Sequence, residues 1–252
     1  MIIRKSPDEI ARMREAGRVV ASAIDRLVAE VRPGITTADL DAVAEEHIRG
    51  LGAVPSFKGY RGFPASICTS VNEEIVHGIP GHRRLREGDL LSLDVGAIWE
   101  GYQGDSAVSL FVGEPPSDQA DKLVRVAEES LEAGVAQIRP GGRLSDISNA
   151  IQQVVEGAGF SVVREYVGHG IGQSMHEDPP VPNYGPPGRG PELRPGLVIA
   201  VEPMVNVGGW QTRLLSDQWT VVTADGSLSA HFEHTIAVTD DGPEVLTARH
   251  RA

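Results

Sequence analysis

Three acidic residues lie inside stretches of the sequence that are otherwise apolar. Asp94 is in LLSLDVGAIW, Glu202 in GLVIAVEPMV and Glu233 in SAHFEHTIAV, and each stretch has the composition of a buried β-strand. Removing an ionised carboxylate from water is costly unless a cation or strong hydrogen-bond donors compensate its charge. Because the chain contains only three lysines, three buried acids predict a multivalent cation that the carboxylates share.

The composition of the chain excludes several other kinds of protein. A length of 252 residues, with 40% hydrophobic and 23% charged residues, is ordinary for a globular protein of one large α/β domain or two fused halves. The formal net charge of -12 argues against direct binding of nucleic acid, since that requires a basic face. We therefore expect no nucleic-acid partner.

Targeting and redox features favour the cytoplasm. The first residues predict a charged amphipathic helix without the apolar centre of a signal peptide, and no stretch of about 18 apolar residues could span a bilayer. The single cysteine, Cys68, rules out an internal disulfide and fits a reducing compartment. We expect a cytoplasmic protein with no membrane partner.

The sequence repeats a pattern of two helices followed by a histidine motif. In the first half, Ser6 is a candidate N-cap with Glu9 at the capping-box spacing, and two helices flank the turn in VRPGITTADL. The second half has helices on either side of IRPGGRLSDI, and the two halves then carry VHGIPG and GHGIGQ. Such turns can recur by chance, but this shared order favours a duplication. We predict one catalytic domain over residues 1–252, with halves of about 1–115 and 116–252 related by a pseudo-twofold axis and a site at their seam.

A predicted hairpin over residues 90–113 brings two acids together. If its turn centres between Trp99 and Glu100, antiparallel pairing places Asp94 directly opposite Asp105 on the same face of the sheet. Two opposed carboxylates repel each other, and hard divalent cations would remove that repulsion. A slip of the turn by one residue would put the two acids on opposite faces and weaken the metal interpretation.

Three of the eight histidines lie in glycine-rich or proline-rich loops that lead toward the same seam: His77, His169 and His176. An isolated His-Gly pair is most often structural, but the duplication and the buried acids favour a functional role here. His231 and His234, on either side of the third buried acid, are either structural groups near the site or ligands. The residues alone leave the choice of the metal-binding histidine open.

Four motifs together resemble the type I methionine aminopeptidases, whose pita-bread fold is α/β (α+β), with two pseudo-twofold-related halves around a central antiparallel sheet. The motifs are DVGAIWEGYQGDSA, GHGIGQSMHEDPPVPNYG, AVEPMV and HFEHTIAVT, in the family's order, and the resemblance runs essentially end to end. It implies that two divalent metal ions have five ligands: Asp94, Asp105, His169, Glu202 and Glu233. It also implies that two catalytic histidines bind substrate without binding metal: His77 and His176.

The same resemblance implies the remaining contacts. The pocket for the methionine side chain is similar to one lined here by Tyr60, Phe63, Cys68 and Trp219. Asn72 and Ser229 fall where some members bind a monovalent cation. Gln173 and Met175 stand where many members have arginine and phenylalanine, and Arg61 stands where histidine is common. Met175 is an adaptable apolar replacement, so the methionine pocket should be preserved.

The implied ligands suit a dinuclear hydrolase. Four carboxylates and one imidazole favour Mn(II), Fe(II) or Co(II) and accept Zn(II). A water bridging two such ions would lose a proton near neutral pH and attack the first peptide bond, with Glu202 as the catalytic proton carrier. The resemblance therefore implies removal of the N-terminal methionine of nascent polypeptides whose second residue is small. We expect a monomer and leave a transient contact with the ribosome open.

Three alternative functions are less consistent with the residues. A non-catalytic binding protein on the same fold would lack ligands, and none is missing. An oxygenase with one iron needs two histidines and one carboxylate, whereas this chain has an excess of acids. A proline-specific exopeptidase is the nearest alternative within the fold class, although its relatives carry an N-terminal domain that we do not expect here.

Overall fold

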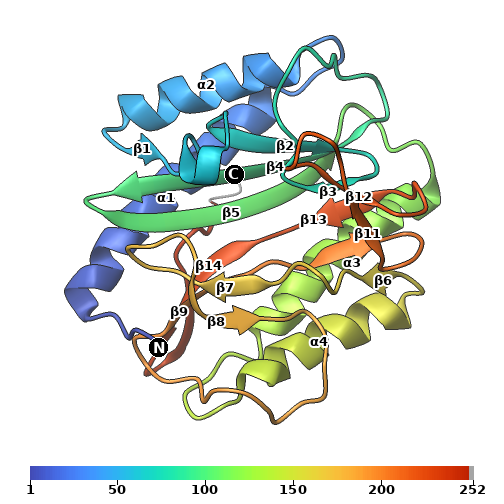
Figure 1. Cartoon of the computed structure of the whole chain (residues 1–252). Coiled ribbons are helices and arrows are strands. Elements are labelled where there is room, and N and C mark those ends of the chain that lie inside the picture. Colours follow the sequence, from blue (N-terminus) through green and yellow to red (C-terminus); the bar gives the residue numbers. More distant parts are fainter. Residues whose placement is uncertain (250–252) are drawn as a thin grey trace.

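The computed structural model describes residues 1–249 (Figure 1). Its first helix, α1 (Pro7–Glu30), begins where the sequence predicts because Ser6 and Glu9 form a capping box. The Ser6 hydroxyl accepts from the Glu9 N–H, and the Glu9 carboxylate accepts from the Ser6 N–H. Met13 and Ile24, on the apolar face of this helix, are fully buried.

The strands form antiparallel sheets throughout residues 1–249. The first sheet has the order β1 (Val54–Pro55), β4 (Leu90–Trp99) and β2 (Ile67–Val71), with β5 (Tyr102–Phe111) also paired to β4. The largest sheet has the order β15 (Gly242–Val245), β14 (His234–Thr239), β9 (Val198–Val201), β7 (Gly168–Gly170) and β8 (Glu177–Val181). Two smaller sheets have the orders β13 (Ser229–His231), β10 (Met204–Asn206), β6 (Ser161–Val162) and β11 (Thr212–Leu214), β12 (Val221–Thr223), β3 (Glu74–Val76).

Two pairs of helices flank these strands. Helix α1 packs against α2 (Thr37–Gly50) on the first sheet, and α3 (Asp118–Val135) packs against α4 (Leu144–Gly157) on the strands of the second half (Figure 1). In the chain, each pair of helices is followed by a run of strands. None of the helices in residues 1–249 combines the length and apolar character that crossing a membrane requires.

The hairpin of β4 and β5 has a different register from the one predicted. Asp94 lies opposite Ala107, and Asp105 lies opposite Gly96, so the two acids are not directly opposed. The turn residues are Glu100 and Gly101, both with positive φ (46° and 82°), and they match the two-residue turn that hairpin twist favours. The prediction placed the turn one residue too early. Moving the turn by one residue shifts the pairing by two residues, so the expectation that such a slip would put the acids on opposite faces was wrong. Because Gly96 is two residues from Asp94, both acids still belong to the same face of the sheet.

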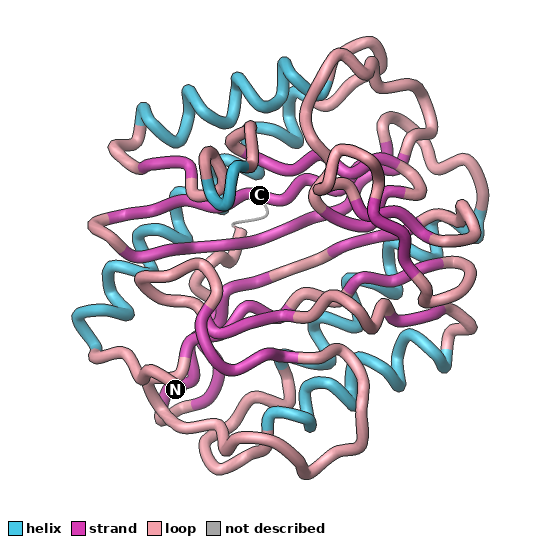
Figure 2. The backbone as a smooth tube through the Cα atoms, viewed as in Figure 1, coloured by secondary structure: helices cyan, strands magenta, loops and turns pink. Residues whose placement is uncertain are grey.

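Two of the acids expected inside strands lie instead where strands are interrupted. Glu202 falls between β9 and β10, and Glu233 falls between β13 and β14. At each of these points the chain crosses between the largest sheet and the same smaller sheet, and Figure 2 draws such interruptions of strands in pink. Pro203 has no N–H to donate to a ladder, which explains one break. At the other, Glu233 and Ala107 exchange backbone hydrogen bonds of 2.9 and 3.4 Å, which join the two halves.

Candidate metal centre and substrate pocket

The five expected ligands line one cavity of about 180 Å³. They come from β4, β5, β7 and the two strand interruptions, and they are Asp94, Asp105, His169, Glu202 and Glu233. The structure therefore brings together residues from both halves of the chain.

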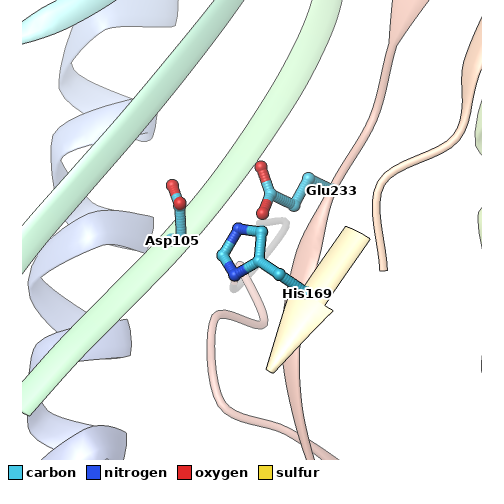
Figure 3. A group of neighbouring side chains, drawn as sticks. All are labelled: Asp105, His169 and Glu233. Atoms are coloured by element: carbon cyan, nitrogen blue, oxygen red, sulfur yellow. The ribbon is translucent and has the colours of Figure 1, made fainter. Parts of the chain in front are cut away.

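Three of these side chains converge most closely (Figure 3). One ligand atom each from Asp105, His169 and Glu233 lies within 4.8 Å of the others, and all three residues are buried. Glu202 joins the group because its Oε1 lies 3.5 Å from His169 Nε2. Asp94 joins it because its carboxyl lies close enough to that of Asp105 for each to affect the pKa of the other. Distances of this order allow a metal ion to be shared among them.

The carboxylates are electrostatically incompatible with one another unless they bind protons or cations. Burial raises the pKa of Asp94 to about 7. Burial, followed by repulsion from neighbouring carboxylates, raises the pKa of Asp105, Glu202 and Glu233 well above their ordinary values. Each of these shifts reports a buried negative charge without enough positive charge near it.

Unpartnered oxygens show where positive charge is missing. Within residues 1–249, Asp94 Oδ1, Asp105 Oδ1 and Glu233 Oε1 are buried and accept no hydrogen bond. Buried polar atoms are almost always satisfied in folded proteins. Three orphaned carboxylate oxygens in one cavity therefore fit a site for hard divalent cations.

His169 presents a nitrogen that can coordinate metal. Its Nδ1 lies 2.9 Å from the carbonyl oxygen of Gly170, so Nδ1–H donates and Nε2 keeps its lone pair. Burial lowers the pKa of His169 to about 4, which keeps the ring neutral. A neutral imidazole whose other nitrogen donates to a backbone carbonyl is a common form of metal ligand.

The other two histidines of the glycine-rich loops also line the cavity. His176 Nδ1 lies 2.9 Å from the hydroxyl of Tyr60, and its ring centroid is 4.2 Å from that of His169. His77 follows β3 with a positive φ of 60° and makes an edge contact with Trp219 at 6.2 Å. Burial lowers the pKa of His77 to about 4, so this ring is also neutral at pH 7.

All four residues expected to surround a methionine side chain lie in the wall of the same cavity: Tyr60, Phe63, Cys68 and Trp219. Tyr60 belongs to the short helix η1 (Tyr60–Gly62), and Phe63 packs edge-on against Trp219 at 5.0 Å. Burial and then the charges of Asp94 and Asp105 raise the pKa of the Cys68 thiol, so the thiol stays protonated and apolar in character.

Sequence reasoning missed several neighbours of the site. Phe57, Val76, Tyr166 and Val167 also line the cavity, and no motif or periodicity singled them out. His231, which the sequence left ambiguous, has a buried and unpartnered Nε2 that lies 3.9 Å from Glu202 Oε2 and from Glu233 Oε2. Its position two residues before Glu233 was the available signal.

The two residues expected near a monovalent cation lie in contact with each other but outside the cavity wall. The Ser229 N–H donates to the carbonyl oxygen of Asn72 over 3.0 Å. The Ser229 hydroxyl is buried without a partner, while the Asn72 side chain is bonded to Asp89 and Leu90.

Comparison with known proteins agrees with this geometry. The sequence model of metallopeptidase family M24 matches residues 11–240. Methionine aminopeptidase 1 of Bacillus subtilis (strain 168) is 58% identical over 247 residues, which cover 98% of this chain and 99% of the relative. The crystal structure of methionine aminopeptidase from Thermotoga maritima has a TM-score of 0.97 and 48% identity, and covers 99% of this chain and 100% of that one.

A more distant likeness shows the fold alone. The prolidase from Pyrococcus furiosus has a TM-score of 0.81 and 21% identity, and the match covers 99% of this chain and 66% of that one. The expected pita-bread fold of α+β class is thus confirmed. Together with the full-length identity to methionine aminopeptidases, these matches show that the chain belongs to metallopeptidase family M24 and, within it, to the methionine aminopeptidases.

Proposed function

We propose that this chain is a type I enzyme that removes the N-terminal methionine of nascent polypeptides whose second residue is small. Its site would lie at the seam of one catalytic domain over residues 1–252, between halves of about 1–115 and 116–252. The observation that carries the proposal is the set of buried, unpartnered carboxylate oxygens that share an apolar-walled cavity with a neutral histidine.

The donor set fits two divalent cations. Asp94, Asp105, His169, Glu202 and Glu233 would hold them, since four carboxylates balance the charge of two divalent ions. Hard oxygen donors with one imidazole suit Mn, Fe or Co and accept Zn. When bound, such ions supply positive charge that makes water more acidic and polarises the peptide carbonyl.

Glu202 is the proposed proton carrier. It faces the cavity beside His169, and a carboxylate in this place can take a proton from the attacking water and deliver it to the leaving amine. His176 is the proposed donor to the substrate carbonyl oxygen. When the Tyr60 hydroxyl donates to Nδ1, the neutral ring of His176 carries its proton on Nε2 and can donate it.

The methionine side chain would lie among the apolar groups of the cavity. Tyr60, Phe63, Cys68 and Trp219 would surround it, and Met175 adds further apolar surface. His77 is a neutral polar group beside Trp219 and would bind the substrate backbone. Because the cavity measures only about 180 Å³, a large second residue would collide with its walls.

The remaining parts of the proposal concern ions, partners and location. A monovalent cation could be held between the backbone carbonyl of Asn72 and the hydroxyl of Ser229. The Ser229 hydroxyl supports this proposal because it is buried without a hydrogen-bond partner. We also propose that the protein is a monomer. Because its substrate would be a nascent polypeptide, we place it in the cytoplasm, in transient contact with the ribosome.

The test is an assay of the chelated protein on short peptides after each metal is added back. Met-Ala-Ser should be cleaved only with metal present, and Met-Leu-Ser and X-Pro dipeptides should be poor substrates. Full activity without metal would refute the proposal. Preferred cleavage of X-Pro dipeptides would instead support a proline-specific exopeptidase.

A further inference from the structure

The loop over residues 172–177, which carries Met175 and His176, is attached to the N-terminal segment by a buried ion pair. Lys5 Nζ lies 2.6 Å from Glu177 Oε2, and the two side chains are only 2% and 8% exposed. Of the three lysines, all within residues 1–249, only Lys5 is buried. Its backbone is fixed as well, because the Lys5 N–H donates to the Gly196 carbonyl over 2.7 Å.

Glu177 connects the ion pair to the loop. Its second oxygen, Oε1, accepts the N–H of Ser174 over 3.3 Å, which closes the loop around the two residues between them. The pair also packs tightly against Gly172: a Cβ at that position would lie 2.6 Å from Lys5 Cε and 2.5 Å from Glu177 Oε1. The loop, Glu177 and Lys5 therefore have little room to move relative to one another.

The start of the same loop is held by a second N-terminal residue. Gln173 Nε2 donates to the Tyr102 hydroxyl over 2.9 Å, and that hydroxyl donates to Glu9 Oε1 over 2.8 Å. Glu9 is the residue that also completes the capping box of α1. The residue before the cap of α1 thus contacts one end of the loop directly, and the first turn of α1 reaches the other end through Tyr102.

A role in stability alone explains the ion pair poorly. Burying two charges costs much of what their attraction returns, and apolar replacements of similar volume are often as stable or more stable. Position is a better explanation, because His176 lies in a loop whose own hydrogen bonds cannot fix its ring. Tyr60 holds the ring at Nδ1, and Glu177 holds the adjacent backbone.

We propose that Lys5, acting through Glu177, is a positioning residue that sets the place of His176 beside the metal ligands. This inference rests on the proposed function of His176 as a hydrogen-bond donor to the substrate carbonyl. Donors of this kind act only when they are correctly placed, and a misplacement of about 1 Å can cost about 10²-fold in rate.

The first experiment compares Lys5→Met, Lys5→Arg and the control Lys122→Met, which removes a lysine exposed on α3. The turnover number kcat and KM are measured on Met-Ala-Ser in protein of equal metal content, well below the melting temperature. Lys5→Met should lower kcat by about tenfold or more with KM changed less than about threefold. Lys5→Arg should restore most of kcat, and Lys122→Met should match the parent. A kcat for folded Lys5→Met within about twofold of the parent would overturn the inference.

A second variant covers the case in which Lys5→Met does not fold. The double variant Lys5→Met/Glu177→Gln leaves no unpaired buried charge, so it should fold while still lacking the ionic contact. Its kcat should be reduced like that of Lys5→Met. A folded double variant with normal kcat would assign the pair to stability only.

The third experiment separates this inference from the function on which it rests. In a His176→Ala background, Lys5→Met should lower kcat no further, because Lys5 acts through His176. If His176→Ala itself leaves kcat unchanged, the proposed function of His176 fails. If His176→Ala is slow and Lys5→Met lowers kcat by the same factor in both backgrounds, only the positioning inference fails.

Discussion

Replacing Asp94 with asparagine should stabilise the metal-free protein and destabilise the metal-loaded one. Burial raises the pKa of Asp94 from 3.8 to about 7, so between these pH values the folded chain binds a proton that the unfolded chain has released. The folded state is then penalised as pH rises, and the penalty is complete above the folded-state pKa. Asparagine carries no charge and escapes it.

The size of the effect follows from the pKa difference. One pKa unit corresponds to about 1.4 kcal/mol. The burial of Asp94 therefore costs the metal-free fold about 1.5 kcal/mol near pH 5, where the folded chain holds the proton, and about 4 kcal/mol above pH 8, where the buried carboxylate is ionised. In a chain of this size 1 kcal/mol shifts the melting temperature Tm by about 2–4 °C. Metal-free Asp94→Asn should therefore melt about 10 °C above the parent at high pH, and only a few degrees above it near pH 5.

The assay is thermal unfolding in EDTA and in excess Mn(II) across this pH range. With Mn(II) the order should reverse, because the parent gains more binding free energy from its complete ligand set. Asp240→Asn, which removes an exposed acid, controls for the general effect of net charge. If the parent and Asp94→Asn show the same pH dependence in EDTA, the reasoning about the buried carboxylates is wrong.

Three further outcomes are expected. His176→Ala should keep both metals and its Tm while losing about 10²–10³ in kcat; loss of metal in this variant would make His176 a ligand instead. Peptides that begin Met-Ala should be cleaved far faster than those that begin Met-Leu, and comparable rates would contradict the steric argument. Gly104→Ala should lower Tm, because a Cβ there would lie 2.8 Å from the backbone nitrogen of Gly17 in α1; an unchanged Tm would show that the helix can move away.

The acids of the site could be recognised from the sequence because their burial is a local anomaly. Asp94 and Glu202 stand out against apolar neighbours, and no partner needs to be known to see that their charge requires compensation. The capping of α1 by Ser6 could be predicted for a similar reason, because the capping box involves only Ser6 and Glu9, three residues apart. By contrast, the choice of His169 as the expected ligand came from the family resemblance, since several histidines satisfy the same local description.

Features that depend on exact register or on distant partners were not predictable in this way. The turn of the hairpin was misplaced although Gly101 marks its second position, because a two-residue turn with positive φ at Glu100 is unusual for that residue type. The contact of Lys5 with Glu177 joins residues 172 positions apart. Nothing in the local sequence of either residue indicates its partner.

The strand interruptions explain why the site is assembled where it is. In an uninterrupted ladder, successive side chains alternate between faces, and every backbone group is committed to a neighbouring strand. Glu202 and Glu233 lie where two segments leave one sheet for another, so their backbones are released from that alternation. Each remains fixed nearby, Glu233 by its exchange of hydrogen bonds with Ala107 and Glu202 by the bond from Asn183 to its carbonyl oxygen. Rigid ladders on both sides can thus hold two acids of the second half against Asp105 of the first, which a single continuous sheet would not allow.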